Sequence, residues 1–329
     1  MKHMTDTNQL VYDVKAVSKY FEYGIILGAK FPAVEDVSFS IDETPRIYTI
    51  AGESGCGKTT LSKILLRILR PDNGTVLYRG KDLWKLKGQD LKNFYRRVQP
   101  VFQDPFDTFN PHESVDNYLI KTAKYILGLN DKGEIKKRVD DALRFVGLSY
   151  EIVTGKRPRE FSGGQLQRVS IARSLISEPE ILLADEPVSM LDASLSLNVL
   201  NLFKKINKEK KTIIIYITHD LSTAYYLSDY IFVMYRGNII EHGPIQLVLD
   251  NPQHPYTQTL LNSLPDYRRR REWFRKKLSP PGLEIKEFLI KGCKYVNQCP
   301  HALTKCSDNK PPMMEVEKEH YVACWLLTK

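Results

Sequence analysis

A glycine-rich segment, GESGCGKTT at residues 52–60, constrains the fold of this chain more than any other part of its sequence. It follows a short apolar run of β-forming residues, Arg46–Ala51. It leads into Leu61–Leu69, whose large apolar side chains fall on one helical face. A strand, a glycine-rich turn and a helix in that order are the context of the G-x-x-x-x-G-K-[ST] phosphate loop. The sequence therefore predicts a nucleotide phosphate site here.

The chemistry of this loop follows from its backbone. Its glycines permit positive φ and close approach, so successive N–H groups can line a nest for an anion. The start of the helix adds partial positive charge at the same point. Lys58 can reach the β- and γ-phosphates and the Thr59 hydroxyl can bind Mg²⁺, while Cys56 is a small spacer rather than a metal ligand. The expected nucleotide contacts are Gly52, Glu53, Ser54, Gly55, Cys56, Gly57, Lys58, Thr59 and Thr60.

Length and composition indicate a globular protein with more than one core. At 329 residues the chain exceeds the usual size of a single core, and its 42% hydrophobic and 26% charged content is ordinary for a soluble protein. The sequence has no apolar run near the roughly 18 residues of a transmembrane helix, and its start is too polar for a signal peptide. We therefore expect a cytoplasmic protein that can still dock on a membrane through partners.

The excess of basic residues is compatible with nucleic-acid binding but is not sufficient to predict it. The net charge is +9, but the excess is spread along the chain apart from one run, Arg268–Arg271. Such a run is typical of a solvated face or linker.

The order of apolar patterns predicts an α/β fold. Short continuous apolar runs are typical of strands buried on both faces of a parallel sheet, and here they alternate with helical patterns. A helical stretch interrupts them, at about residues 105–165, and the composition changes near Asn251. We expect an α/β domain over residues 1–250, which is the nucleotide-binding part, and a small irregular domain over 251–329. The expected strands are Leu10–Ser18, Ala33–Ile41, Ile181–Ala184, Ile213–Ile217, and a hairpin of Ile231–Tyr235 with Ile239–Ile240; Leu195–Ile206 is an expected helix.

Two further motifs follow the phosphate loop. Asp185 and Glu186 end an apolar strand, where Asp185 can hold Mg²⁺ and Glu186 can orient or deprotonate an attacking water. FSGGQ at residues 161–165 precedes a helix, and Ser162 with Gln165 has the spacing of a capping box. The same segment also suits a second phosphate nest at a helix N-terminus.

The set GESGCGKT, FSGGQ and LLADEP, in that order, resembles the ATPase subunit of ATP-binding cassette (ABC) transporters. The resemblance implies a P-loop NTPase cassette with a RecA-like core and a helical insertion, using ATP and Mg²⁺. It implies that Gln103 in VFQDP contacts Mg²⁺ and water, that His219 in ITHD contacts the γ-phosphate, and that Phe21, or less favourably Tyr20, stacks on adenine. Catalysis would then use Glu186, His219 and Gln103, and Mg²⁺ would be held by Thr59, Gln103 and Asp185.

Members of this family pair head to tail, so each ATP lies between two subunits. The resemblance implies that Ser162, Gly163, Gly164 and Gln165 contact the ATP of the partner, and that Asp192 in SMLD lies at the dimer interface. Phe161 and Met190 replace the commoner leucine and alanine of the two motifs, and neither change removes a polar group that the chemistry needs.

The C-terminal part indicates which subfamily of these ATPases the chain resembles. HPYT at residues 254–257 and the four cysteines Cys293, Cys299, Cys306 and Cys324 resemble the extension of oligopeptide/dipeptide importer ATPases. From the residues alone, the thiols can hold zinc, an iron–sulfur cluster, two disulfides or nothing. Reducing cytosol disfavours disulfides, and the C-x-x-C pairs usual for structural zinc are absent. The gaps of five, six and seventeen residues suit a cluster, and the resemblance implies [4Fe–4S], with zinc as the alternative.

The resemblance implies an ATP-hydrolysing subunit on the cytoplasmic face of the membrane that energises import of small oligomeric solutes. Peptides are expected first, with oligosaccharides or nickel also compatible. The implied partners are a second, sister ATPase subunit, two transmembrane permease subunits and an extracellular solute-binding protein, with no nucleic acid. The alternative is a soluble ABC-type ATPase acting on nucleic acid or ribosomes. Such proteins commonly carry two cassettes or a long coiled coil, and the sequence shows neither. A regulatory subunit with a degenerate ATP site is disfavoured by the intact Lys58, Asp185, Glu186 and His219.

Overall fold

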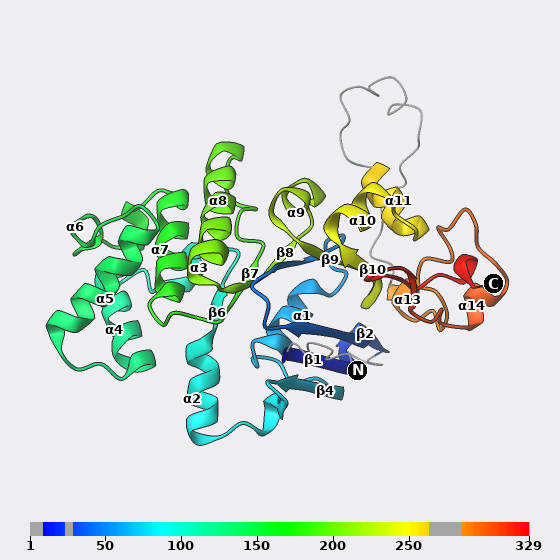
Figure 1. Ribbon diagram of the computed structural model, residues 1–329, viewed down its shortest axis with the longest axis horizontal. Coiled ribbons are helices and arrows are strands. Elements are labelled where there is room, and N and C mark those ends of the chain that lie inside the picture. The colour runs from blue at the N-terminus through cyan, green and yellow to red at the C-terminus, as the bar shows by residue number, and fades with distance from the viewer. Residues whose placement is uncertain (1–8, 24–28, 263–284, 329) are drawn as a thin grey trace, which may run out of the picture.

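The computed structural model describes residues 9–23, 29–262 and 285–328. The basic run Arg268–Arg271 lies outside these ranges. Figure 1 shows a central sheet with the helices α3 to α7 at one end of the long axis and the C-terminal elements at the other.

The central sheet has the strand order β11-β12-β10-β9-β3-β8-β7-β6. The five strands from β9 to β6 are parallel to one another. Every residue of β3, β7 and β8 is buried, as expected for strands covered on both faces. The strand predictions in this region and the β9–β10 hairpin are confirmed. The strands are β3 (Ile47–Ala51), β6 (Val98–Val101), β7 (Ile181–Asp185), β8 (Ile213–Thr218), β9 (Tyr230–Tyr235) and β10 (Asn238–Pro244).

A second, antiparallel sheet has the order β2-β1-β4-β5. The two strands expected near the N-terminus are present and longer than predicted, and they pair with each other here rather than joining the central sheet. A core around α1 fills the space between the two sheets. The elements are β1 (Leu10–Tyr23), β2 (Ala29–Asp42), α1 (Lys58–Leu65), β4 (Asn73–Tyr78) and β5 (Lys81–Asp82).

The chain between β6 and β7 is mainly helical, as its sequence pattern predicts. The apolar stripe expected on one helix is buried, at Ile135, Val139, Ala142 and Leu143. Its bounds as a separate subdomain stay a prediction. The helices are α3 (Pro105–Thr108), α4 (Val115–Leu127), α5 (Lys132–Phe145), α6 (Tyr150–Val153) and α7 (Gly163–Leu175), with the 3₁₀ turn η2 (Pro158–Glu160) before α7.

The remaining helices of the cassette cover the sheet or its edges. The helix predicted after β7 is longer than expected, because it continues to Lys210. These elements are η1 (Leu83–Lys85), α2 (Gly88–Arg97), α8 (Ala193–Lys210), α9 (Leu221–Leu227) and α10 (Ile245–Asp250).

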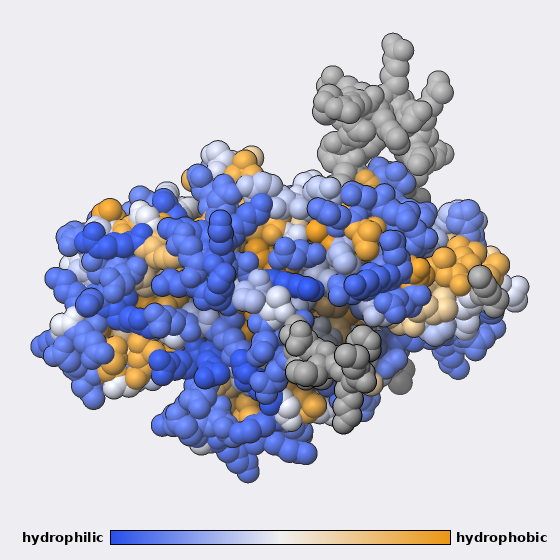
Figure 2. Space-filling model, in the orientation of Figure 1, coloured by the Kyte–Doolittle hydropathy of each residue, from blue (hydrophilic) through white to orange (hydrophobic). Residues whose placement is uncertain are grey.

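The C-terminal elements are attached to the central sheet. β12 pairs with β10, so the last hairpin extends the sheet at its edge. The division of the chain at residue 250 therefore crosses a continuous sheet, and it stays a prediction. Apolar side chains also come to the surface at this end of the molecule (Figure 2). The elements are α11 (Pro255–Asn262), α13 (Ile285–Phe288), α14 (Lys305–Asp308), β11 (Met314–Glu317), β12 (His320–Val322) and η4 (Trp325–Leu327).

Across the described ranges, no helix combines the length and the apolar character needed to cross a membrane.

Candidate functional site

The phosphate loop lies between β3 and α1, so the predicted strand, turn and helix are confirmed. Gly57 precedes α1 with φ 110° and Gly52 follows β3 with φ 156°. A Cβ on Gly57 would lie 2.1 Å from the Ala33 carbonyl oxygen, and one on Gly52 would lie 2.2 Å from that of Met234. Only glycine fits these positions because both the backbone angle and the neighbouring carbonyls exclude a side chain.

Lys58 lies inside this loop. Its side chain is buried, and Nζ donates hydrogen bonds of 2.8 Å to the carbonyl oxygens of Gly52 and Glu53. The first turn of α1 has no side-chain cap, so its N–H groups are available to an anion. The loop thus offers amides and an ammonium group, which is the chemistry that a triphosphate requires.

Asp185 ends β7 beside the loop. Burial, and then the charge of Glu186, raise the pKa of the Asp185 carboxyl, whereas the neighbouring Thr59 and Ser62 hydroxyls and the Lys58 charge lower it. Its Oδ1 is buried and has no hydrogen-bond partner among the described residues. A buried carboxylate oxygen without a partner, beside a threonine hydroxyl, fits an Mg²⁺ ligand set. The predicted pair Thr59 and Asp185 is therefore brought together.

Three residues predicted to be catalytic converge at the ends of neighbouring strands. Gln103 follows β6, Glu186 follows β7 and His219 follows β8. The Gln103 Nε2 lies 3.4 Å from Glu186 Oε2, and the His219 Nδ1 lies 3.1 Å from Glu186 Oε1. Glu186 has φ 44°, and its N–H donates to the Ile217 carbonyl at 2.9 Å. The left-handed conformation is unusual for glutamate, and backbone strain of this kind clusters at functional sites.

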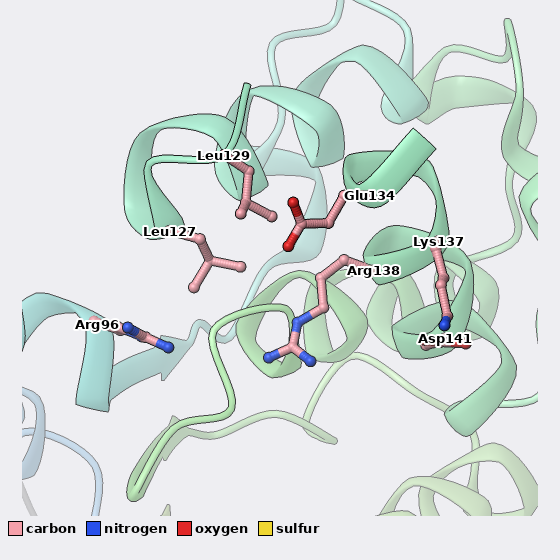
Figure 3. Close-up of a pocket in the computed structure, with 7 residues that line it drawn as sticks. All are labelled: Arg96, Leu127, Leu129, Glu134, Lys137, Arg138 and Asp141. Carbon is pink, nitrogen blue, oxygen red and sulfur yellow. The ribbon is translucent and has the colours of Figure 1, made fainter. Parts of the chain in front are cut away.

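A cavity of about 420 Å³ adjoins this constellation. Its lining includes Thr59, Gln103 and Asp185. A larger cavity, about 580 Å³, lies among α2, α4 and α5 and includes none of the predicted site residues (Figure 3). Its lining mixes leucines with charges of both signs, at Arg96, Leu127, Leu129, Glu134, Lys137, Arg138 and Asp141. Cavity size therefore does not locate the nucleotide chemistry in this molecule.

The FSGGQ segment caps α7. The Gln165 N–H donates to Ser162 Oγ at 3.3 Å, and the Ser162 N–H donates to Gln165 Oε1 at 3.1 Å, so the capping box is confirmed. Asp192 caps α8 by accepting from the Leu195 N–H at 2.9 Å. A Cβ on Gly164 would lie 3.0 Å from Leu195, so the signature packs against the start of α8. Contact of these residues with nucleotide stays a prediction.

Phe21 lies on β1 and is 38% exposed. Its ring centroid is 6.2 Å from that of Phe31, which is 5.7 Å from that of Phe288 in the C-terminal part. A half-exposed ring supported from behind can stack on a base, but the adenine role of Phe21 stays a prediction.

All five cysteines are free thiols, and Cys56 lies buried in the phosphate loop. Burial, and to a smaller extent the other three C-terminal thiols, raise the pKa of the Cys293 thiol to about 11, so the four share one neighbourhood. The Cys293 N–H donates to the Cys306 carbonyl at 2.8 Å, and the Leu303 N–H donates to Cys306 Sγ at 3.4 Å. Within the described ranges, however, no three His, Cys, Asp or Glu side chains are arranged to hold a metal ion.

Sequence reasoning missed two contributors to the site. The Ser62 hydroxyl faces Asp185, and its position one turn after Thr59 on α1 was the available signal. The Gly237 N–H donates to the Cys56 carbonyl at 2.9 Å, which ties the β9–β10 turn to the phosphate loop. No local pattern marks that contact because the two residues lie far apart in sequence.

Comparison with known proteins agrees with this geometry. The family model "ABC transporter" matches residues 34–189, and "Oligopeptide/dipeptide transporter, C-terminal region" matches residues 240–306. The oligopeptide transport ATP-binding protein AppF of Bacillus subtilis is 37% identical, across 98% of this chain and 99% of AppF. The oligopeptide transport ATP-binding protein OppF of Streptococcus mutans is 39% identical, across 80% of this chain and 84% of OppF.

Two solved structures share the fold. One is a dimeric ATP-binding cassette in a post-hydrolysis state with ADP and Pi, at a TM-score of 0.63 and 27% identity, covering 71% of this chain and 98% of that one. The other is part of the cbiONQ ABC transporter complex of Clostridium perfringens. Its TM-score is 0.63 and its sequence identity 28%, and the match covers 74% of this chain and 92% of that one.

This chain belongs to the ABC transporter ATP-binding family and is of the oligopeptide/dipeptide importer type. The cassette fold, the α/β class and the ATPase activity predicted from the motifs are thereby confirmed. ATP and Mg²⁺ are the ligands expected of this family.

Proposed function

We propose that this chain hydrolyses ATP to drive the import of oligopeptides or dipeptides. The observation that carries the enzymatic part is the convergence of Gln103 and His219 on Glu186, beside the Asp185 carboxylate and the phosphate loop. The solute class is supported by the match over residues 240–306 and by relatives named oligopeptide transport ATP-binding proteins. Oligosaccharides and nickel are the other solutes to test.

Each site residue has a separate role in binding or hydrolysing ATP. The amides of residues 52–60 and the Lys58 ammonium bind the β- and γ-phosphates, and Thr59, Asp185 and Gln103 hold Mg²⁺. Bound Mg²⁺ neutralises charge that develops on the phosphate oxygens. Glu186 orients the attacking water and accepts its proton, while His219 lies at the γ-phosphate. Phe21 supports the adenine.

We place this subunit in a head-to-tail pair, with Ser162–Gln165 and Asp192 facing the nucleotide of the partner. Two apolar side chains near Asp192 support an interface there, because Met190 is 64% exposed and Leu197 is 51% exposed. The partner is a sister subunit, and two permease subunits with a solute-binding protein complete the importer. The pair then lies on the cytoplasmic face of the membrane. The cassette occupies residues 1–250, its helical subdomain about 105–165, and the C-terminal domain 251–329.

The four C-terminal cysteines are the proposed ligands of a [4Fe–4S] cluster. The four ligands of a cluster bind four different irons, so they stand further apart than the ligands of a single ion. The other three C-terminal thiols lie close enough to Cys293 to raise its pKa, and four neighbouring thiols are the ligand set that a [4Fe–4S] cluster uses. The cationic core of a cluster also favours thiolates, whereas burial raises the pKa of the Cys293, Cys299 and Cys324 thiols.

The cluster is tested by iron and acid-labile sulfide content after anaerobic purification of the full chain. Cys306→Ser should lose iron, and Cys56→Ser should retain it because Cys56 lies in the phosphate loop. Stoichiometric zinc without iron, or iron retained in Cys306→Ser, would contradict the assignment.

The transport proposal is tested by reconstituting the chain with its permease subunits, its sister ATPase and the solute-binding protein in liposomes. Peptides should stimulate ATP hydrolysis and accumulate inside the vesicles. Stimulation by a sugar or nickel alone would overturn the solute class. Steeply salt-dependent binding to RNA or DNA, with no permease on co-purification, would instead support the nucleic-acid alternative.

A further inference from the structure

Tyr256, the tyrosine of the His-Pro-Tyr segment, touches the phosphate loop. Its side chain is 1% exposed, and its hydroxyl accepts a hydrogen bond of 3.2 Å from the N–H of Glu53. Glu53 is the second residue of that loop. The contact joins two residues separated by 203 positions. None of the roles assigned above accounts for it.

The hydrogen bond between Tyr256 and Glu53 fixes the orientation of the Gly52–Glu53 peptide group. The Glu53 N–H and the Gly52 carbonyl belong to the same trans peptide, so they point in opposite directions. The Gly52 carbonyl accepts from Lys58 Nζ at 2.8 Å, while the Glu53 N–H donates to Tyr256 on the other side. The tyrosine therefore fixes the orientation of the carbonyl that holds the Lys58 ammonium. Rotation of this peptide would move that carbonyl away from Lys58.

The tyrosine is itself held firmly at its backbone. Buried Glu241 accepts from the N–H groups of Gln253, at 2.8 Å, and His254, at 3.0 Å. The His254 Nδ1 in turn accepts from the Tyr256 N–H at 3.0 Å. Burial lowers the pKa of His254 to about 4, so near neutral pH the imidazole is uncharged and Nδ1 is free to accept. The segment just before α11 is thus anchored before the Tyr256 ring reaches the loop.

The ring of Tyr256 is also held in place by packing. Its centroid is 4.4 Å from that of Tyr235 and 5.5 Å from that of Tyr295. Burial raises the pKa of Tyr256 well above its ordinary value, so the hydroxyl keeps its proton and offers a lone pair to Glu53. A neutral hydroxyl on a buried, immobile ring is a fixed acceptor rather than an adaptable one.

We propose that Tyr256 is a positioning residue of the ATP site, whose hydroxyl orients the Gly52–Glu53 peptide and so keeps Lys58 and the loop amides arranged for the phosphates. It acts on nucleotide affinity rather than on the chemical step, because Glu186, His219 and Gln103 lie at other strand ends. The proposal requires ATP binding, which the family establishes, and does not depend on which solute is imported or on the cysteines.

The test is Tyr256→Phe in the full-length chain, with Tyr295→Phe as the matched control. Each change removes one hydroxyl from the same tyrosine cluster, but the Tyr295 hydroxyl pairs with Thr259 Oγ1 at 3.0 Å and not with the loop. Loss of one hydrogen bond should raise the Kd of ATP about three- to ten-fold in Tyr256→Phe. The kcat at saturating ATP should change less than about two-fold, since the interaction is made equally in the ground and transition states. Tyr295→Phe should bind ATP as the unmodified chain does.

A second variant, Glu53→Pro, removes the donor instead of the acceptor. In that background Tyr256→Phe should weaken ATP binding no further, because the hydrogen bond is already gone. Unchanged ATP affinity in Tyr256→Phe, equal weakening by Tyr295→Phe, or losses that add in the double variant would each overturn the proposal. A loss of kcat larger than the change in KM would also overturn it.

Discussion

Gly57→Ala should weaken ATP binding strongly, for two separate reasons that the structure shows. The first is the backbone, because alanine at φ 110° occupies a conformation that side chains disfavour by about 1–2 kcal/mol. The second is contact, because the new Cβ would lie 2.1 Å from the Ala33 carbonyl oxygen. The phosphate loop and β2 must then separate by roughly an ångström to restore normal contact.

That displacement is large compared with the tolerance of a hydrogen bond, whose donor–acceptor distance spans only about 2.7–3.2 Å. If two loop amides lose their bonds to a charged phosphate, the loss is about 3–6 kcal/mol, which is a hundred-fold or greater rise in Kd. Gly155→Ala is the matched control. It has φ 71°, and its Cβ would meet nothing within 4 Å, so it carries the backbone cost alone.

The assay is the Kd of a fluorescent ATP analogue, together with thermal unfolding of each variant. Gly155→Ala should lower the melting temperature slightly and leave the Kd unchanged. Gly57→Ala should lower ATP affinity at least a hundred-fold while remaining folded at the assay temperature. If Gly57→Ala binds ATP within about three-fold of the unmodified chain, the inference that β2 and β9 leave no room for a side chain in the loop is wrong.

Three further substitutions test the site. Glu186→Gln should retain ATP but lose turnover by at least about a hundred-fold, and normal turnover would refute its role with the water. Asp185→Asn should lose Mg²⁺-dependent hydrolysis. Without Mg²⁺, the Asp185→Asn variant should also have a higher melting temperature than the unmodified chain near neutral pH. Burial raises the pKa of Asp185, so the stability of the unmodified chain falls as pH rises from the ordinary carboxyl pKa to the raised one. A lower melting temperature of the variant across pH 4–8 would contradict this. Phe21→Ala should weaken ATP by roughly five-fold or more while leaving tripolyphosphate binding unchanged, since stacking affects only the base, and equal weakening of both would exclude it as the adenine support.

The elements that sequence patterns predicted best are those that a short run of neighbouring residues identifies, whatever their hydrogen-bond partners. The strand before Gly52, the buried strand that ends at Asp185 and the capping box at Ser162 were all marked by local periodicity or spacing. Parallel strands end at one edge of the sheet, so the convergence of Gln103, Glu186 and His219 follows once their strands are recognised.

For the N-terminal strands, the sequence predicted the strands but not how they pair. Their apolar alternation predicted β-structure, but not that β1 and β2 form a separate antiparallel sheet around α1. Pairing choice depends on which faces other elements cover, and that information lies in α1 and β4 rather than in the strands themselves. The C-terminal hairpin shows the same limit, since a strand as short as His320–Val322 has too few residues for a readable alternation.

Contacts between the C-terminal part and the nucleotide site were the least predictable feature. Lys294 is buried and pairs with Glu35 on β2 at 2.7 Å, and Arg236 in the β9–β10 turn pairs with Glu287 at 2.7 Å. With 48 basic and 39 acidic residues in the chain, sequence alone offers far too many possible pairs to select these. Both pairs nevertheless involve segments that touch the phosphate loop, as does Tyr256. Glu287 and Lys294 of the C-terminal part therefore bind two segments that contact the phosphate loop, the β9–β10 turn and β2.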